Sequence, residues 1–226
     1  MIGVFDSGAG GVAALGYLRD AMPRADLAFL ADRENAPYGK KSEEELVRLV
    51  TNDIKRLRCV GAQDILMACC TACTVYDKLS PTDREIAHPI IAPTAEAAVR
   101  ATKTGRIGVL ATERTVNCSA FRLAILSLIP NATVIERAAP ELVFAVEHGL
   151  VRNEVRKAVF DAIAGILHGE CDTLILGCTH FSHLTDIIGE IAPTLTLIDS
   201  AKEGAISLSN KLKDKGEGGA RLILLT

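Results

Sequence analysis

Two short segments place cysteines where they could transfer protons. Cys69–Ala72 (CCTA) and Gly177–His180 (GCTH) each follow a short apolar run. A cysteine thiol has a pKa of about 8.5, so it can give up or take back a proton close to neutral pH. His180 stands shortly after Cys178 and can assist the proton transfers of that thiol. The two segments therefore indicate acid–base chemistry by a pair of thiols.

A third segment, Asp6–Gly11 (DSGAGG), joins an apolar run to a helical pattern. Backbone N–H groups at the start of a helix suit a small carboxylate ligand. Gly8, Gly10 and Ala13 also fit a relaxed dinucleotide-binding fingerprint, with Asp32 further along as the ribose-binding acid. The Asp6 carboxylate would repel a pyrophosphate placed there, which favours the small carboxylate over the dinucleotide.

Short apolar runs that alternate with amphipathic stretches must position these segments. Runs that are apolar on both faces are typical of buried strands in a parallel sheet. In the first half of the chain the predicted strands are Ile2–Phe5, Leu27–Ala31, Ile65–Ala68 and Ile90–Ala92. The clearest helix begins at Ser42, with Glu45 completing a capping box. Its apolar stripe consists of Leu46, Val50, Ile54 and Leu57.

The second half of the chain repeats this order of elements. Ile107–Leu110 echoes Ile2–Phe5, and Asp172–Thr179 echoes Asp64–Thr71. Two further strands are predicted at Thr133–Ile135 and Thr196–Ile198. A helical pattern over Ala201–Gly219 and an apolar run at Arg221–Leu225 follow, and these could close either half.

The repeat predicts an α/β fold with two similar domains, each a doubly wound parallel sheet. We favour an internal duplication over the self-similarity that any parallel α/β chain shows. The expected domains are residues 1–93 with 200–226, and residues 94–199. Ligands of open parallel sheets bind beyond the carboxyl ends of the strands, so the active site is expected in the cleft between the two domains.

Composition excludes several classes of protein. The chain has 226 residues, of which 49% are hydrophobic and 23% charged, as in ordinary globular proteins. A net charge of −3, 4% aromatic residues and no Trp argue against a nucleic-acid partner. We expect no membrane span and no secretory signal, and hence a cytoplasmic protein. Seven cysteines, an odd number, then favour thiol chemistry or metal binding over a disulfide framework.

A zinc site is the main competing interpretation of the cysteines. Cys69, Cys70 and Cys73 lie close together, but no second pair with zinc-like spacing completes four ligands, so no metal is expected. The other cysteines, Cys59, Cys73, Cys118 and Cys171, are expected to have no functional role. The other histidines, His88, His148, His168 and His183, are expected in loops or on helix surfaces.

The chain resembles the glutamate racemase family of the aspartate/glutamate racemase superfamily. The resemblance rests on segments that run in the family's order from residue 2 to residue 200, and the most specific are Phe5–Gly11 (FDSGAGG) and Leu174–His180 (LILGCTH). The others are Pro37–Gly39, Ala68–Ala72, Thr112–Thr115, Val146–Gly149 and Ile198–Ser200. The resemblance implies two α/β domains with the substrate between them and a C-terminal segment that returns to the first domain.

The family's functional residues fall on matching positions of this chain. The resemblance implies that the catalytic thiols are Cys69 and Cys178, helped by Asp6 and His180 respectively. It also places residues of this chain at substrate-contacting positions: Ser7, Tyr38, Gly39, Cys70, Thr71, Thr115, Glu147 and Thr179. It implies a cofactor-independent racemase of a small amino acid, commonly a homodimer, that supplies D-glutamate for peptidoglycan.

Departures from the family pattern keep other functions open. Cys70 stands where the family has Asn, and Asn35 stands where it has Arg. The chain is also shorter than a typical member. The alternatives are a racemase or decarboxylase of aspartate or another small amino acid, and a non-catalytic ligand-binding homologue. The internal repeat aligns Cys70 with Cys178, whereas the family motif aligns Cys69, which we favour because Ala68 and Thr71 fix the spacing on both sides.

Overall fold

A computed structural model of the chain describes residues 1–213 and 218–225. The chain divides into two compact units. Unit 1 contains Met1–Ile90 and Ala201–Thr226, and unit 2 contains Ile91–Ser200. Each unit is built around one parallel sheet.

Unit 1 holds a sheet of five strands in the order β4-β3-β1-β2-β9. The strands are β1 (Ile2–Asp6), β2 (Leu27–Ala31), β3 (Asp64–Met67), β4 (Ala87–Pro89) and β9 (Leu222–Leu225). All of the pairings are parallel. Every residue of β1 and β2 is buried, as the continuous apolar runs predict for strands covered on both faces.

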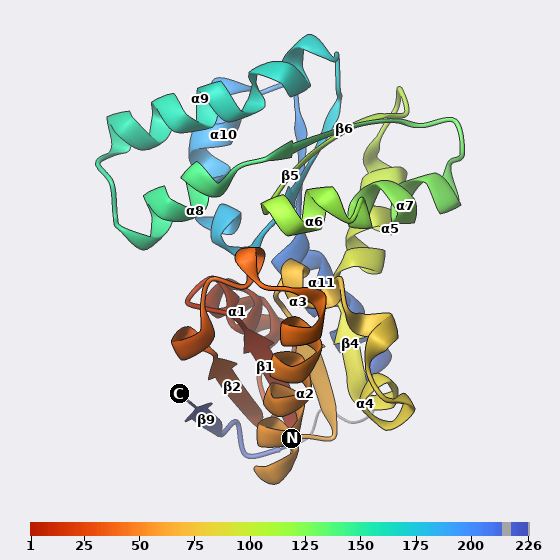
Figure 1. The fold of residues 1–226 in the computed structure, drawn as a ribbon, viewed down its shortest axis with the longest axis vertical. Coiled ribbons are helices and arrows are strands. Elements are labelled where there is room, and N and C mark those ends of the chain that lie inside the picture. The colour runs from red at the N-terminus through yellow and green to blue at the C-terminus, as the bar shows by residue number, and fades with distance from the viewer. Residues whose placement is uncertain (214–217, 226) are drawn as a thin grey trace. The chain divides into compact units, whose positions relative to one another are not determined.

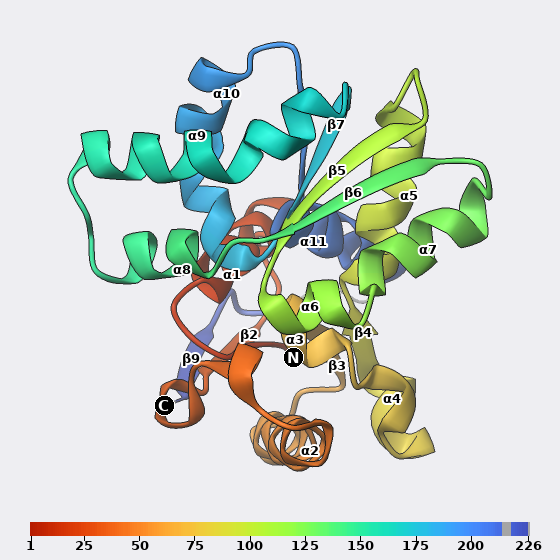
Figure 2. The same cartoon turned by 45° about the horizontal axis from the view of Figure 1, so that its top comes forward.

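Helices cover both faces of this sheet (Figures 1 and 2). Helix α2 (Glu43–Cys59) packs on one face, where Leu57 lies close to Gly3 of β1. Helices α1 (Gly11–Ala21) and α11 (Ser200–Lys211) pack on the other, where Gly204 of α11 lies against Leu66 of β3. The shorter helical elements of unit 1 are η1 (Arg33–Asn35), η2 (Tyr38–Lys40), α3 (Cys70–Cys73), η3 (Tyr76–Lys78) and α4 (Pro81–Ile86).

Helix α2 forms as its sequence predicts. The Ser42 side chain accepts a hydrogen bond from the Glu45 backbone, and the Glu45 side chain accepts one from the Ser42 backbone, so the capping box is present. The four predicted apolar residues are all buried: Leu46, Val50, Ile54 and Leu57. One charged residue, Asp53, is buried on the same face of the helix.

Unit 2 holds a sheet of four strands in the order β6-β5-β7-β8. The strands are β5 (Arg106–Ala111), β6 (Thr133–Ala138), β7 (Thr173–Gly177) and β8 (Thr196–Asp199). When the four strands of each half are matched in chain order, this is the same arrangement as β4-β3-β1-β2. The architecture of two similar doubly wound parallel sheets is therefore confirmed, with β9 added at one edge of unit 1.

The sheet of unit 2 also has helices on both faces (Figure 2). Helix α9 (Arg152–His168) brings Ile166 against Gly108 of β5, and α7 (Ala120–Leu128) brings Phe121 against Gly177 of β7. Helix α5 (Ile91–Ala101) packs beside α7. The remaining helical elements are α6 (Glu113–Asn117), α8 (Pro140–Glu147), η4 (Thr179–Leu184) and α10 (Thr185–Ile191).

Two local expectations about the β4 region are wrong. Ile90–Ala92 is not a strand, because the strand is Ala87–Pro89 and α5 begins at Ile91. Pro89 ends a strand at the sheet edge, where a missing backbone N–H costs no ladder hydrogen bond. His88 lies in β4, with Nε2 at 3.0 Å from Asp64 Oδ1, rather than in a loop or on a helix.

The predicted domain boundary after residue 93 falls inside the first turn of α5. Pro93 is tolerated there because backbone N–H groups in the first turn of a helix have no intrahelical acceptor, so its missing N–H costs no hydrogen bond. The helix predicted over Ala201–Gly219 ends at Lys211 instead. Residues 214–217 of that prediction lie outside the described residues. No helix within the described residues is both long and apolar enough to cross a membrane.

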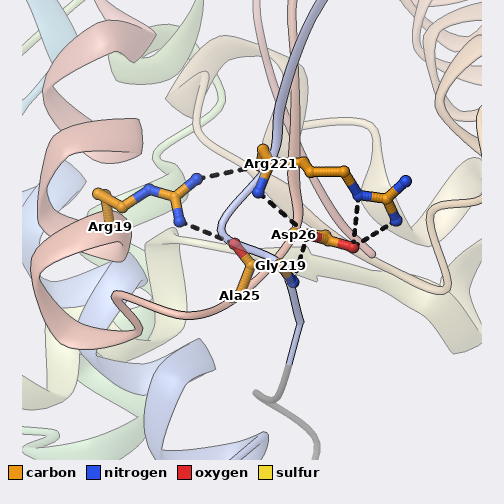
Figure 3. Close-up of polar contacts among 5 residues, drawn as sticks. All are labelled: Arg19, Ala25, Asp26, Gly219 and Arg221. Atoms are coloured by element: carbon orange, nitrogen blue, oxygen red, sulfur yellow. Dashed lines mark hydrogen bonds and ion pairs between the residues drawn. The ribbon is translucent and has the colours of Figure 1, made fainter.

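The C-terminal strand is held to unit 1 by an exposed polar cluster (Figure 3). The Asp26 carboxylate accepts hydrogen bonds from the backbone amides of Gly219 and Arg221 and from the Arg221 guanidinium. The Arg19 guanidinium donates to the backbone carbonyls of Ala25 and Arg221. The hydrogen bonds from Arg221 lower the pKa of Asp26 to about 2, so its carboxylate is ionised at neutral pH.

We predict that Asp26→Asn loosens β9 without unfolding unit 1. The substitution removes the charge and one of the two strong acceptor oxygens that hold Arg221. Hydrogen exchange of the amides of Leu222–Leu225 should become at least several-fold faster. Asp20→Asn, which removes the same charge from the exposed surface of α1, is the control. Unchanged protection of β9 in Asp26→Asn would contradict the anchoring role.

Candidate active site

Three candidate residues of unit 1 meet at the carboxyl edge of its sheet. Asp6 is the last residue of β1 and is completely buried. Cys69 follows the end of β3, the strand that pairs with β1. The Ser7 hydroxyl lies 3.4 Å from the Cys69 thiol, although the two residues are 62 positions apart in the sequence. Because β1 connects to β2 on one side and β3 lies on the other, this is the point of an open α/β sheet where ligands bind.

The surroundings of Cys69 keep its thiol protonated. Burial and the neighbouring Asp6 carboxylate raise the pKa of Cys69 to about 11, while the hydrogen bond to Ser7 acts in the opposite direction. Burial disfavours the charged thiolate, and a nearby negative charge does the same. The Cys69 thiol therefore carries its proton at neutral pH.

The glycine-rich turn holds Asp6 in place. The Gly8 amide donates a hydrogen bond of 2.8 Å to Asp6 Oδ1. A Cβ atom on Gly11 would lie 2.4 Å from the Cβ of Asp6, so only glycine fits where α1 begins. The glycines of this turn thus accommodate a buried carboxylate beside the helix N-terminus.

The second acid of the dinucleotide interpretation, Asp32, is also engaged. Its carboxylate accepts hydrogen bonds from Asn35 Nδ2 at 2.9 Å and from the Tyr38 hydroxyl at 2.6 Å. The Tyr38 hydroxyl also lies 2.8 Å from Asp53 Oδ2 on α2. Asp32 thus supports the Tyr38–Lys40 turn, which contains Gly39, and is not directed to a ribose.

Unit 2 places a second thiol in a different electrostatic setting. Cys178 directly follows β7, and its thiol lies 3.5 Å from Nδ1 of His180. Nε2 of His180 lies 3.1 Å from Oε1 of Glu147, at the end of α8. His180 is buried, whereas the Glu147 side chain is 41% exposed. The imidazole can accept the thiol proton, and the carboxylate can stabilise the resulting imidazolium.

Cys69 and Cys178 occupy matching positions in the two units. Each is the residue immediately before the helical element that follows a strand, α3 in unit 1 and η4 in unit 2. Cys70 is instead the first residue of α3 and is buried. This geometry aligns Cys69 with Cys178 and agrees with the alignment that the family motif favours.

Hydroxyl side chains line the same strand ends. Thr71 in α3 and Thr179 in η4 are both buried close to the thiols in sequence. Thr115 is buried in α6, after β5, and its hydroxyl lies 2.9 Å from that of Thr112. These residues lie at the strand ends of their own units, where the family resemblance implies substrate contacts.

The remaining cysteines show no shared site. Cys73 donates its thiol hydrogen to the Met67 carbonyl at 3.3 Å, and Cys59 and Cys118 are exposed. Within residues 1–213 and 218–225, no three side chains of His, Cys, Asp or Glu gather where they could hold a metal ion. Asp53, which the sequence analysis did not select, is the residue added by the structure. The sequence pattern that could have identified Asp53 is a carboxylate on the apolar stripe of the amphipathic helix α2.

Comparison with known proteins agrees with this α/β architecture. The Asp/Glu/Hydantoin racemase family model matches residues 18–207, and the chain belongs to that family. A glutamate racemase of Aquifex aeolicus (strain VF5) is 36% identical over 224 residues, which cover 98% of this chain and 87% of the relative.

Two solved structures extend the comparison to the fold. The crystal structure of glutamate racemase isoform RacE1 from Bacillus anthracis has a TM-score of 0.88 and 31% identity. Glutamate racemase from Francisella tularensis, crystallised with D-glutamate, has a TM-score of 0.89 and 25% identity. Each comparison covers 99% of this chain and 86% of the other.

Two substitutions should move the pKa of Cys69 in opposite directions. Asp6→Asn removes the negative charge but keeps an oxygen that accepts from the Gly8 amide, so the pKa should fall. Ser7→Ala removes a hydrogen bond that favours the thiolate, so the pKa should rise. The measurement is the rate of Cys69 alkylation as a function of pH, followed by peptide mass spectrometry. Well below the pKa, the rate should change about tenfold for each pKa unit.

Exposed Cys59, in the same digest, controls for reagent concentration. If both variants shift the Cys69 profile in the same direction, the electrostatic account of this thiol is wrong.

Proposed function

We propose that this protein interconverts L- and D-glutamate without a cofactor, using Cys69 and Cys178 as the two proton-transfer groups. The observation that carries the proposal is the matched position of two buried cysteines at the strand ends of similar units, each beside a group that can influence its proton. The similarity to proteins named glutamate racemase, over nearly the whole chain, supports the choice of substrate. The proposal includes a homodimer that supplies D-glutamate for peptidoglycan.

The chemistry requires two acid–base groups. Inverting an α-carbon means removing its weakly acidic proton from one face and returning a proton to the opposite face. One thiol must start as the thiolate and the other as the thiol, and the roles exchange with the enantiomer bound. Thiols suit this work because moderate changes in their surroundings select one form or the other.

The residues around each thiol differ in what they can contribute. In unit 1, Asp6 favours the protonated form of Cys69, and the Ser7 hydroxyl can stabilise the thiolate when substrate binding produces it. In unit 2, His180 Nδ1 can take the Cys178 proton while Glu147 faces the other ring nitrogen. Direct proton transfer to and from the α-carbon stays with the sulfur atoms.

The negative charges of the substrate also need partners. Backbone amides near Ser7 and Gly39 and the hydroxyls of Thr71, Thr115 and Thr179 are the proposed carboxylate-binding groups. Hydrogen bonds to a charged carboxylate are typically stronger than those between neutral groups, by about a factor of two. Acid–base catalysis supplies roughly 10²–10⁴-fold, so orientation and stabilisation of the carbanionic transition state must supply the rest.

The direct test is incubation with L- or D-glutamate and, separately, aspartate in D₂O, followed by chiral analysis. We expect glutamate racemisation with solvent deuterium at the α-carbon. The preparation is first dialysed against a chelator and receives no added cofactor. Cys69→Ser and Cys178→Ser should each lower turnover roughly 10²-fold or more, because a serine hydroxyl is a far weaker acid than a thiol.

Cys59→Ser, at an exposed cysteine, is the matched control and should keep nearly full activity. Near-normal turnover of either strand-end variant would refute the two-thiol mechanism. Racemisation of aspartate alone would refute the glutamate assignment, and loss of activity on chelation would refute cofactor independence.

A further prediction concerns Cys70, which stands where the resembled family has Asn. A thiol is a weak hydrogen-bond donor and acceptor, whereas an amide does both well. Cys70→Asn should therefore raise kcat/KM for glutamate by roughly tenfold, the worth of one hydrogen bond to a carboxylate. The ratio of glutamate to aspartate turnover measures the effect. Unchanged selectivity or an inactive variant would show that Cys70 belongs to a differently organised site.

A further inference from the structure

The strongest feature outside the two thiol clusters is a buried hydrogen-bonded chain in unit 1. Asp32 after β2, Tyr38 in η2 and Asp53 in α2 are each almost completely buried. The Tyr38 hydroxyl oxygen lies 2.6 Å from Asp32 Oδ2 and 2.8 Å from Asp53 Oδ2. Both O···O distances are those of hydrogen bonds.

The Asp32–Tyr38–Asp53 hydrogen-bonded chain needs one more proton than two ionised carboxylates and a phenol provide. The phenol carries a single hydrogen and can donate it to only one carboxylate. The other close O···O contact would then join an ionised oxygen to an oxygen with no hydrogen between them. A proton on the second carboxyl group removes this repulsion, because that group can then donate to the phenol oxygen.

The surroundings indicate which carboxyl group carries the extra proton. Asp32 also accepts a hydrogen bond from the Asn35 side chain, so a donor other than Tyr38 already serves as a partner of its carboxylate. The charged groups that face Asp53 are Asp32 from the end of β2 and Arg56 of its own helix, and the titratable phenol of Tyr38 faces it from η2. The Arg56 guanidinium stays 3.8 Å from Asp53 Oδ1, and its own side chain is substantially exposed.

We propose that Asp53 is a positioning residue that shares a proton with Asp32 through Tyr38 and thereby holds the Tyr38–Gly39 backbone in its substrate-binding conformation. The chain runs from the protonated Asp53 to the Tyr38 oxygen, and from the Tyr38 hydrogen to ionised Asp32. It ties the short η2 turn to two regular elements, β2 and α2. The inference about substrate rests on the proposed function, whereas the shared proton does not.

Ionisation of Asp53 should therefore weaken the hydrogen bonding that fixes the η2 turn. Burial raises the pKa of Asp53 to about 7, and the Tyr38 hydrogen bond and Arg56 only partly oppose this. The same burial, together with Asp53, raises the pKa of Tyr38, so the phenol keeps its hydrogen throughout. The Asp53 proton is thus lost close to neutral pH, and the close contact then becomes repulsive.

The sign of the stability effect follows. A carboxyl group whose pKa is raised on folding contributes most below its unfolded pKa, here 3.8, and that contribution is lost as the pH rises through about 7. Asp53→Asn replaces the protonated acid with an amide that donates to the Tyr38 oxygen at every pH. The variant should therefore lack this part of the pH dependence.

The first arm of the test measures melting temperature from pH 4 to pH 9 for the wild type, Asp53→Asn and Asp83→Asn. Asp83 is another buried aspartate of unit 1; it accepts a hydrogen bond from the Ser80 hydroxyl and takes no part in the Asp32–Tyr38–Asp53 hydrogen bonds. The melting temperature of the wild type should fall relative to that of Asp53→Asn as the pH rises towards 7. The difference in melting temperature between the wild type and Asp83→Asn should not change in this way. Parallel curves for the wild type and Asp53→Asn would overturn the shared proton, whatever the activity.

The second arm measures KM and kcat for D-glutamate over the same pH range. The wild-type KM should rise through neutral pH by roughly tenfold, the effect of losing one such hydrogen bond, while Asp53→Asn shows no such step. Tyr38→Phe should show the raised KM at every pH. Identical KM profiles for the wild type and Asp53→Asn would overturn the positioning role, and a protein without racemase activity would refute the proposed function while the first arm still decides the shared proton.

Discussion

Parallel pairing of β1 with β2 on one side and β3 on the other is the constraint on which the site in unit 1 depends. Because the three strands run in the same direction, Asp6, Asp32 and Cys69 all emerge at one edge of the sheet. The backbone fixes this edge: the Asp32 amide donates to the Asp6 carbonyl, and the Ala68 amide donates to the Phe5 carbonyl. Unit 2 repeats the strand order, which brings Cys178 to the equivalent edge of its own sheet.

Burial at these edges makes charge the second organising factor. An unpaired charge away from water is strongly unfavourable, so each buried carboxyl group has polar partners or a proton. The Gly8 amide donates to Asp6, and Asn35 and Tyr38 donate to Asp32. The Tyr38 oxygen is also the hydrogen-bond partner of Asp53. The two thiols consequently differ in surroundings, since burial and a neighbouring carboxylate raise the pKa of Cys69, whereas an imidazole lies beside Cys178. The proposed mechanism needs two acid–base groups that begin in opposite protonation states, and this asymmetry supports the proposal.

Local sequence signals predicted most of the regular structure, and their failures have identifiable causes. The apolar run at Ile90–Ala92 looks like a buried strand, yet Ile91 begins α5 and the strand is the preceding Ala87–Pro89. A short apolar run has the same appearance in a buried helix as in a buried strand, and only packing decides between them. Asp53 was missed for a related reason. Its place on the apolar stripe of α2 marks it as unusual, but its partner Tyr38 comes from a separate turn.

Local sequence patterns were enough to predict the alternation of strands and helices, the capped start of α2, the glycine turn after β1 and the cysteines that follow β3 and β7. These are properties of neighbouring residues, such as periodicity, capping and turn conformation. Folding was needed to show that Ser7 contacts Cys69, that Tyr38 joins Asp32 to Asp53, that Glu147 faces His180, and that β9 extends the sheet of unit 1 beside β2. Each of these contacts joins segments distant in the chain, and such contacts depend on the order in which strands pair and helices pack, which no local pattern encodes.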